Sequence, residues 1–306
     1  MGRNRPQTGD HAAGFGRSPG RAATSGMIMQ SRMPETLVSE VTHTRPSAVT
    51  LADGLYIGAG EPVVLMAGPC AVESYEQTRA VAEVMARLGL KVLRGGAFKP
   101  RTSPDSFQGL GEEGLRILRA VADEFGLLVI TEALGVEHLP LVADYADIIQ
   151  IGSRNMQHYP LLWAVGELDK PVLLKRGFMS TVREWLLAAE HIARRGNERI
   201  LLCERGIRTF ETATRNTLDT NAIALVKREA PWPVLGDPSH ATGRADLVLP
   251  AARAAVAAGA DGLLVEVHPR PEEALSDGAQ SLPVEALPEF VDHVAGIAAA
   301  LGRGIT

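Results

Sequence analysis

The stretch GEEGLRILRAVADEFGLLVITEA, residues 111–133, contains the pattern that decides the fold. Its first part, residues 111–126, places apolar side chains at intervals of three and four, which is typical of a helix packing on a sheet. Its second part, residues 127–133, begins with a nearly continuous apolar run, as expected of a parallel strand whose outer face is covered. The stretch therefore predicts a helix followed by a buried parallel strand.

The same alternation of helix and strand recurs from about residue 62 to the C-terminus. Eight strand-like runs are VVLMAGPC (63–70), KVLRGGAF (91–98), LLVITEA (127–133), DIIQIGSR (147–154), PVLLKRG (171–177), RILLCERG (199–206), PVLGDPSH (233–240) and GLLVEVHP (262–269). Eight such units predict an α/β protein with a (β/α)8 TIM barrel, and SAVTLADGLYIGAGEP (47–62) predicts a short N-terminal β-hairpin over its bottom. A doubly wound open sheet is the competing fold, but no GxGxxG fingerprint opens the first helix.

The first 46 residues differ in composition from the rest of the chain. The segment MGRNRPQTGDHAAGFGRSPGRAATSG (1–26) is rich in Gly, Arg, Ser and Pro and has no apolar period. Such a segment cannot repay the entropy of ordering, so residues 1–46 are predicted to be a disordered tail, or sequence upstream of a start at Met27 or Met33. Residues 47–306 are predicted to form a single catalytic barrel domain that includes the hairpin.

Composition excludes several classes of partner. A formal net charge of −5 disfavours nucleic-acid binding, which needs a basic surface. No apolar run approaches the length of a membrane helix, so no membrane association is expected. The two cysteines, Cys70 and Cys203, lie far apart and do not indicate a disulfide framework, which favours a cytoplasmic location.

Charged or polar side chains end all eight predicted strands. In chain order they are Cys70; Arg94 and Lys99; Glu132; Gln150 and Arg154; Lys175 and Arg176; Arg205; Asp237 and His240; and Glu266 and His268. One such residue is usually a solvated charge or a satisfied histidine. All eight strands ending this way, with little charge at their other ends, predict an active site at the mouth of the barrel, where barrel enzymes place their chemistry.

The cations in this set indicate an anionic substrate. Period-two alternation places Arg154 on the same face as Gln150, and Arg205 on the same face as Cys203, toward the barrel axis. Guanidinium and ammonium groups that converge on one mouth would repel each other unless anions bind between them. Phosphorylated substrates are therefore expected, and so many cations suit two phosphates better than one.

A second group of strand-end residues indicates a metal site. The first, seventh and eighth strands are neighbours in a closed barrel, so Cys70, His240 and Glu266 are expected to lie together. Asp277, which follows the eighth strand, can reach the same place. One thiolate, one imidazole and two carboxylates suit a divalent manganese, iron, cobalt or zinc ion. Cys70 alone would more often be a small buried apolar residue, but three further ligand types favour the metal.

These motifs together resemble one enzyme family. The matching strings are AGPCAVES (67–74), LRGGAFKPRTSP (93–104), FQGLGEEGL (107–115), QIGSRNMQ (150–157), LLKRG (173–177), CERGIRTFE (203–211), TRNTLD (214–219), DPSHATGR (237–244), ADGLLVEVHP (260–269) and ALSDGAQSL (274–282). They resemble the 3-deoxy-D-arabino-heptulosonate 7-phosphate (DAHP) synthases of the shorter type I subgroup, which is related to the 3-deoxy-octulosonate 8-phosphate synthases. Long strings in order are far more specific than one short motif.

The resemblance implies a reaction and a role for each matched residue. It implies the condensation of phosphoenolpyruvate with erythrose 4-phosphate at the entrance to the shikimate pathway of aromatic amino acid and chorismate biosynthesis. The implied phosphoenolpyruvate site is Arg94, Lys99, Glu132, Gln150, Arg154, Lys175 and Arg205; the aldose phosphate site is Arg101, Thr102 and Asp237; the metal ligands are Cys70, His240, Glu266 and Asp277. Lys99, as the proton donor, and His240 are the catalytic residues.

Alternatives and partners follow from the same resemblance. An octulosonate phosphate synthase using arabinose 5-phosphate is the near alternative, and the KPRT turn (99–102) looks like the four-carbon version. A non-catalytic phosphosugar-binding barrel would be expected to lack ligands or cations that are present here.

A homo-oligomer, a dimer or tetramer, is expected. No additional regulatory domain is expected in this chain, so aromatic amino acids should inhibit it little, with control from a partner such as a separate chorismate mutase.

Overall fold

The structure is a computed structural model that describes residues 48–52, 54–100, 103 and 105–306. The predicted tail, residues 1–46, lies outside the described residues. So do Arg101 and Thr102 of the predicted aldose phosphate site.

Eight parallel strands form a closed sheet. They are β3 (Val64–Gly68), β4 (Val92–Arg94), β5 (Leu128–Glu132), β6 (Ile148–Ile151), β7 (Val172–Lys175), β8 (Ile200–Glu204), β9 (Val234–Gly236) and β10 (Gly262–His268). Each strand pairs in parallel with the next one along the chain, and β10 pairs with both β9 and β3, which closes the barrel. The predicted (β/α)8 barrel is confirmed. A two-residue strand, β11 (Leu282–Pro283), adds to the end of β10.

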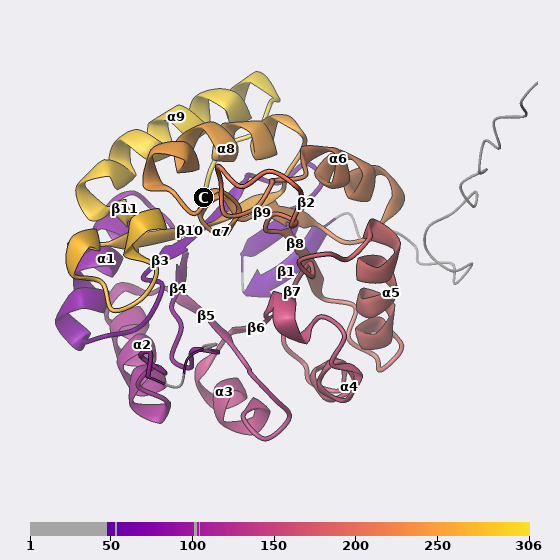
Figure 1. The fold of residues 1–306 in the computed structure, drawn as a ribbon, viewed down its shortest axis with the longest axis horizontal. Coiled ribbons are helices and arrows are strands. Elements are labelled where there is room, and N and C mark those ends of the chain that lie inside the picture. Colours follow the sequence, from indigo (N-terminus) through magenta and orange to yellow (C-terminus); the bar gives the residue numbers. More distant parts are fainter. Residues whose placement is uncertain (1–47, 53, 101–102, 104) are drawn as a thin grey trace, which may run out of the picture. The chain divides into compact units, whose positions relative to one another are not determined.

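Helices surround the sheet (Figure 1). They are α1 (Tyr75–Arg87), α2 (Glu112–Phe125), α3 (Leu139–Tyr145), α4 (Tyr159–Gly166), α5 (Val182–Ala193), α6 (Thr220–Glu229), α8 (Ala245–Ala257) and α9 (Leu287–Ala300). A further short helix, α7 (Pro238–Thr242), follows β9 directly. Each outer helix buries its apolar stripe on the sheet, as α2 does with Leu115, Leu118 and Val121. None of the helices in the described ranges has the length and apolar character of a membrane span.

Alternate side chains along the strands build two separate apolar layers. The inward-facing set, Val64, Met66, Val92, Ile130, Ile148, Leu173, Leu201, Cys203, Leu235 and Leu264, fills the lower part of the barrel. Their outward-facing neighbours, such as Leu65, Leu93 and Val129, pack under the helices. Cys203 therefore packs in the apolar interior, on the face that the strand alternation turns toward the barrel axis. The period of two that makes this core also decides which side chains face the mouth.

An antiparallel hairpin closes the bottom of the barrel. Its strands are β1 (Ala48–Ala52) and β2 (Leu55–Gly58), and Val49 pairs with Ile57 across them. Val49, Leu51 and Ile57 belong to the same apolar cluster as the inward-facing barrel residues. The predicted hairpin and its place over the bottom are thus confirmed, and substrate access is left to the opposite end.

Replacing Ile57 with alanine should destabilise the barrel. Ile57 is fully buried against the lower layer, so truncation leaves a cavity and should cost about 2–5 kcal/mol of unfolding free energy. Tyr56→Ala, one residue away on the exposed face of the same strand, is the matched control and should cost much less. Urea denaturation of both variants measures the difference. Equal losses would show that burial of Ile57 against the barrel adds no stability of its own.

Candidate active site

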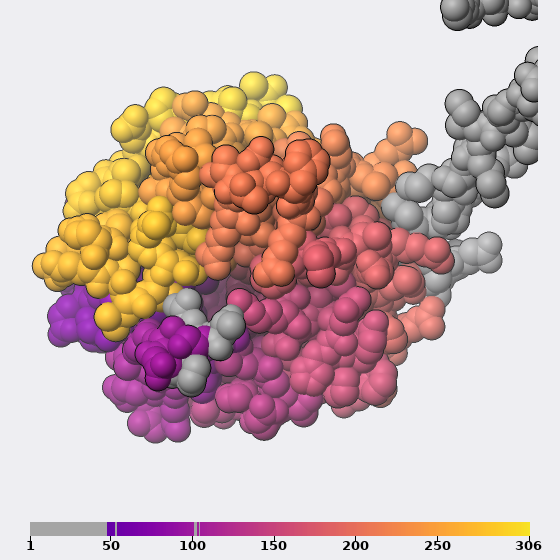
Figure 2. Space-filling model, in the orientation of Figure 1, coloured from indigo at the N-terminus to yellow at the C-terminus, as the bar shows by residue number. Residues whose placement is uncertain are grey.

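A cavity of about 400 Å³ opens at the C-terminal ends of the strands. Its lining includes Arg94, Phe98, Lys99, Ser103, Ser106, Thr131, Glu132, Gln150, Arg154, Arg215 and Asp277. Figure 2 shows this face, on which the yellow segment after β10 lies next to the indigo-to-magenta segment after β4. The mouth of the barrel is therefore hollow and polar, as the strand-end residues predict.

The polar lining continues the inward-facing register of the strands. Two positions after an apolar inward residue comes a polar one: Arg94 after Val92, Glu132 after Ile130, Gln150 after Ile148, Lys175 after Leu173, Arg205 after Cys203, Asp237 after Leu235 and Glu266 after Leu264. A strand turns the same face inward every second residue, so these seven side chains form a polar layer directly above the apolar one.

Arg94 joins the cavity to the loop after β3. Its Nη1 donates to the carbonyl oxygens of Pro69 (2.6 Å) and Cys70 (3.1 Å) and lies 3.0 Å from Glu266 Oε1. Burial opposes the charged form, but Glu266 and the other acids nearby raise the pKa of Arg94, so it stays charged. Its Nε has no hydrogen-bond partner although it is buried. A buried guanidinium with a spare donor at a cavity wall is suited to binding an anion.

The other cations lie in two groups. The guanidinium groups of Arg205 and Arg154 lie 4.7 Å and 5.5 Å from the centre of the Phe178 ring. Burial lowers the pKa of Arg205, although Asp237 opposes this. The ammonium group of Lys175 forms a buried ion pair with Asp237 Oδ2 at 2.7 Å. The structure thus brings these cations to the mouth, with Asp237 partly compensating them.

Glu132 and Gln150 form a hydrogen-bonded pair on the cavity wall. Gln150 Nε2 donates to Glu132 Oε2 at 2.9 Å, across the pairing of β5 with β6. A Cβ added at Gly152 would overlap the Glu132 carboxylate, so only glycine leaves room for this rotamer. The pair places a carboxylate in a fixed orientation beside the cations of the cavity.

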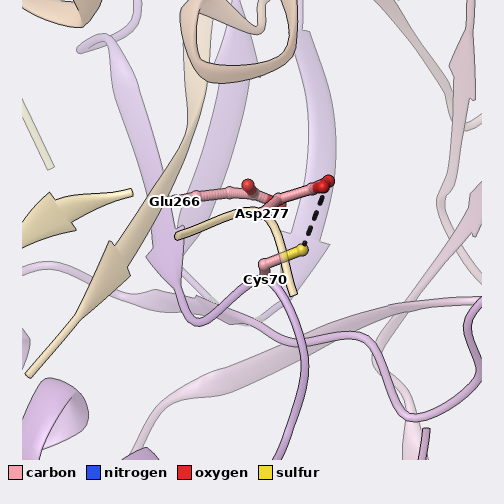
Figure 3. Close-up of side chains that lie close together, drawn as sticks. All are labelled: Cys70, Glu266 and Asp277. Carbon is pink, nitrogen blue, oxygen red and sulfur yellow. Dashed lines mark hydrogen bonds between the residues drawn. The ribbon is translucent and has the colours of Figure 1, made fainter. Parts of the chain in front are cut away.

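Three of the four predicted metal ligands form a compact cluster (Figure 3). One donor atom from each of Cys70, Glu266 and Asp277 lies within 4.8 Å of the others. Cys70 Sγ is 3.7 Å from Asp277 Oδ2 and 2.9 Å from the hydroxyl of Ser276. One thiol and two carboxylates are a donor set that suits a divalent first-row metal, so these residues fit such an ion.

His240 lies beside this cluster. Its Nε2 is 3.4 Å from Glu266 Oε1 and its Nδ1 is 2.7 Å from Asp237 Oδ2. It is placed there by α7, whose first turn is capped by Asp237 accepting from the His240 backbone N–H at 3.0 Å. Burial lowers the pKa of His240, so the ring is held neutral and able to coordinate through nitrogen.

Burial and neighbouring charges set the protonation of the cluster. Burial, reinforced by Glu266, raises the pKa of the Cys70 thiol to about 11, although Lys99 and Arg94 oppose this. Burial alone would raise the pKa of Glu266, but the protonated form of His240, which is present in acid, together with Arg94 and Lys99 lowers it to about 2. Glu266 therefore already has the charge that a metal ligand needs, whereas the thiol would have to lose its proton when a metal binds.

Comparison with known sequences identifies the family. Residues 40–301 match the sequence profile of the DAHP synthetase I family. The chain belongs to the DAHP synthetase I family. The resemblance found in the sequence motifs is thereby confirmed, and it extends over the hairpin as well as the barrel.

Relatives within and beside the DAHP synthetase I family differ in their similarity to the chain. A Thermotoga maritima protein named phospho-2-dehydro-3-deoxyheptonate aldolase is 56% identical over 275 residues, which are 90% of this chain and 81% of that protein. A Syntrophotalea carbinolica protein named 2-dehydro-3-deoxyphosphooctonate aldolase is 36% identical, over 82% of this chain and 96% of that protein.

Solved structures of the Thermotoga maritima enzyme share the fold. A crystal structure of its phospho-2-dehydro-3-deoxyheptonate aldolase (DAHP synthase) superposes with a TM-score of 0.85 at 56% identity, covering 89% of this chain and 79% of that one. A truncated form of the enzyme superposes with a TM-score of 0.81 at 52% identity, covering 88% and 98%.

Three further residues contact the cluster of Cys70, Glu266 and Asp277, here called the ligand cluster, and they were not identified from the sequence. Gln280 Nε2 donates to Glu266 Oε2 at 2.7 Å, and Arg215 Nη1 donates to Gln280 Oε1 at 2.7 Å and to Asp277 Oδ2 at 3.3 Å. Ser276 contacts the thiol of Cys70, as described above. All three lie inside the family motifs TRNTLD and ALSDGAQSL, which was the available signal.

Two of the predicted strand-end residues, Arg176 and His268, face away from the cavity. Arg176, next to Lys175, forms ion pairs with the buried Glu204 (2.8 Å) and the partly buried Asp219 (2.9 Å) and lies over the ring of Trp185 in α5. His268, two residues after Glu266, contacts Glu73 instead of the ligand cluster. Adjacent positions of a strand point to opposite faces, which explains Arg176.

Proposed function

We propose that the chain is a 3-deoxy-7-phosphoheptulonate synthase, a transferase that condenses phosphoenolpyruvate with erythrose 4-phosphate and water to give DAHP and phosphate. The observation that carries the proposal is that, in a member of this family, a cationic cavity lies directly beside a thiol and carboxylate cluster suited to a divalent metal. Barrel enzymes place their reacting groups at this end of the strands.

The four-carbon aldose is favoured over arabinose 5-phosphate by the relatives. The protein named for the heptonate product is 56% identical to this chain, whereas the named octonate relatives are 32% to 36% identical. Asp237, through its contacts with Lys175 and His240, is proposed to face the aldose. Arg101 and Thr102 are proposed to bind its phosphate from the turn after β4.

The anion of phosphoenolpyruvate is proposed to bind among the cations of the cavity. Arg94, Lys99 and Arg154 line the cavity, while Lys175 and Arg205 come from the ends of the neighbouring strands β7 and β8. Glu132 and Gln150, on β5 and β6 between the strands that carry Arg94 and Lys175, complete the proposed site. Several cations there would pair with the phosphate and carboxylate in place of water and orient C3 of the substrate toward the aldehyde.

The metal ligands are proposed to be Cys70, His240, Glu266 and Asp277, holding manganese, iron, cobalt or zinc. A divalent ion bound there would supply Lewis-acid polarisation of the aldehyde oxygen. Arg94 and Gln280, which each hydrogen-bond to Glu266, fix the orientation of that carboxylate.

Lys99 is proposed to donate the proton that the reaction needs. As C3 of phosphoenolpyruvate attacks the aldehyde carbon, the aldehyde oxygen becomes an alkoxide and takes a proton from Nζ of Lys99. Water then adds at C2; one of its protons restores Lys99, the other leaves with phosphate as the C2–O bond breaks, and C2 becomes the ketone carbon. Support for this role comes from the position of Nζ, which contacts the backbone carbonyl and the sulfur of Cys70 at the edge of the cavity. His240, between Asp237 and Glu266, is proposed as the second catalytic residue.

Assay of the purified chain with each aldose phosphate tests the function. With phosphoenolpyruvate and a scan of Mn²⁺, Fe²⁺, Co²⁺ and Zn²⁺, phosphate release should depend on erythrose 4-phosphate. Faster release with arabinose 5-phosphate would instead assign the chain to octulosonate phosphate synthesis. Release with neither aldose under any metal would support a phosphosugar-binding barrel.

Partners and location are proposed on more general grounds. A homo-oligomer, a dimer or tetramer, and control through a separate chorismate mutase are proposed from the family. A cytoplasmic location is supported by the two cysteines, Cys70 and Cys203, which are both free thiols in the structure.

A further inference from the structure

We propose that Glu73 and His268 are positioning residues for the metal centre, which hold the loop of residues 269–281 against the loop of residues 69–74 so that Asp277 faces Cys70. The first loop follows β10 and the second follows β3. The inference rests on the proposed metal site, and its experiment is designed to fail separately from that proposal.

The two loops carry ligands from opposite ends of the chain and touch at two points. At the first point, Cys70 Sγ meets Ser276 and Asp277. At the second, Glu73 Oε1 accepts a hydrogen bond from the backbone N–H of Leu275 at 2.8 Å. Glu73 is three residues from Cys70, and Leu275 is two residues from Asp277, so the Glu73 contact sets how the two ligands align.

The second carboxylate oxygen of Glu73 engages His268. Glu73 Oε2 lies 3.4 Å from His268 Nε2, and both side chains are largely buried. The other ring nitrogen, Nδ1, accepts a hydrogen bond from the backbone N–H of Arg270 at 3.0 Å. Because Nδ1 is an acceptor, the ring carries its proton on Nε2, where it faces the carboxylate. His268 thereby ties the start of the same loop to Glu73.

The backbone of Asp277 shows why this loop needs anchors. Asp277 has φ 50° and ψ 34°, and among the described residues no other non-glycine residue has a positive φ. A left-handed conformation at such a residue is strained and persists where the surroundings enforce it. A Cβ added at the next residue, Gly278, would overlap the carbonyl oxygen of Pro271, so the loop is also tightly closed on itself.

The anchors lie on two sides of Asp277. Arg215 holds the Asp277 carboxylate on the side of the loop after β8. On the side of Cys70, the hydrogen bond from the backbone N–H of Leu275 to Glu73 sets the distance between Asp277 and the Cys70 thiol. Loss of Glu73 should therefore let Asp277 relax away from Cys70 while leaving the cations of the phosphoenolpyruvate cavity in place. The expected consequence is weaker metal binding without weaker anion binding.

Manganese binding by the full chain tests the proposal. The metal-free protein is titrated with Mn²⁺, and free Mn²⁺ is followed by electron paramagnetic resonance. Glu73→Ala should raise the Kd for Mn²⁺ by about 10–100-fold, as expected for loss of a group that orients ligands. Glu73→Gln should raise it less, because its amide oxygen can still accept from Leu275. His268→Ala should weaken Mn²⁺ binding in the same direction, and adding it to Glu73→Ala should have little further effect.

Glu76 provides matched controls. It is an exposed glutamate three residues further along, in the first turn of α1, and its removal takes away the same charge. Glu76→Ala and Glu76→Gln should bind Mn²⁺ as the wild type does. Phosphoenolpyruvate binding to all metal-free variants, measured by calorimetry, should be unchanged, and circular dichroism checks folding.

Two outcomes would overturn the proposal. One is Mn²⁺ affinity of the Glu73 variants equal to that of the Glu76 variants carrying the same substitution. The other is a parallel loss of phosphoenolpyruvate affinity, which would mean a general loss of structure. If Glu73→Ala does not fold, the Mn²⁺ affinities of Glu73→Gln and Glu76→Gln are compared instead, and they decide the test. Failure of the wild type itself to bind Mn²⁺, Co²⁺ or Zn²⁺ would instead overturn the metal site, and with it the proposed function.

Discussion

Replacing Lys99 with methionine is expected to lower kcat by at least about 10²–10⁴-fold, the usual contribution of a positioned general acid. Nζ of Lys99 lies where the cationic cavity meets the ligand cluster, 3.1 Å from the Cys70 sulfur and hydrogen-bonded to the Cys70 carbonyl oxygen. Methionine preserves the length and apolar stem of the side chain but removes both the charge and the proton. The variant should therefore fold normally but be unable to protonate the oxygen of the aldehyde.

Two further variants separate proton donation from charge and from general damage. Lys99→Arg keeps a cation at the site, but its guanidinium does not release a proton, so it should remain as slow as the methionine variant. Lys91→Met makes the same substitution at the start of β4, on an exposed side chain at the opposite end of the barrel, and should be as active as the wild type. Steady-state kcat and KM for both substrates are the measurements.

Recovery of most activity by Lys99→Arg would show that Lys99 serves only as a positive charge. Near-normal turnover of Lys99→Met would remove it from the chemistry altogether. A rise in the KM for phosphoenolpyruvate with kcat unchanged would place its role in substrate binding alone.

The fold could be predicted because the pattern of each barrel unit lies within a short stretch of sequence. Residues 112–125 repeat apolar side chains at helical spacing, and residues 128–132 continue as an apolar strand. Eight repetitions of such a unit have few other ways to bury both the helix stripes and the two faces of the strands. The hairpin of residues 48–58 was predictable for the same reason, since it has an apolar face and no other sheet to join.

The polar layer could be predicted because it shares the register of the core. Arg94, Gln150, Arg205 and Glu266 each stand two residues after an inward-facing apolar or thiol side chain. Strand alternation therefore carries them into the mouth whatever the loops do. The same rule should have turned Arg176 outward, since Lys175 before it faces inward.

Contacts made by loops could not be predicted from local pattern. Gln280 and Glu266 are 14 residues apart, whereas Arg215 and Asp277 are 62 apart and Glu73 and Leu275 are 202 apart. Neither helical nor strand periodicity extends into these segments, so nothing local specifies which side chains meet. The order of the strands predicted that His240 lies beside Glu266, and it does, but its contact with Asp237 comes from the five-residue helix α7, which no longer-range pattern in the sequence indicated.

Replacing Cys70 with alanine is expected to remove metal and activity together. Cys70 supplies the soft donor of the cluster, and its side chain is buried between Ser276, Asp277 and Lys99. Loss of a direct ligand should weaken binding by more than the 10–100-fold, roughly, that loss of an outer partner costs. Cys70→Ser keeps the size of the side chain but replaces thiolate with a harder donor, so it should shift preference away from zinc and toward manganese.

Cys203→Ala is the matched control, because Cys203 is equally buried but packs in the apolar layer below the site. It should keep most of the metal and most of the activity, with only a modest loss of stability. Treatment of the wild type with a chelator should abolish turnover, and Mn²⁺, Co²⁺ or Zn²⁺ should restore it, whereas no added metal should restore Cys70→Ala fully. Elemental analysis links metal content to rate in each preparation. If protein shown to be metal-free still forms product at the untreated rate, the juxtaposition of Cys70, Glu266 and Asp277 has no part in the reaction, and the cations of the cavity must then account for catalysis by charge and orientation alone.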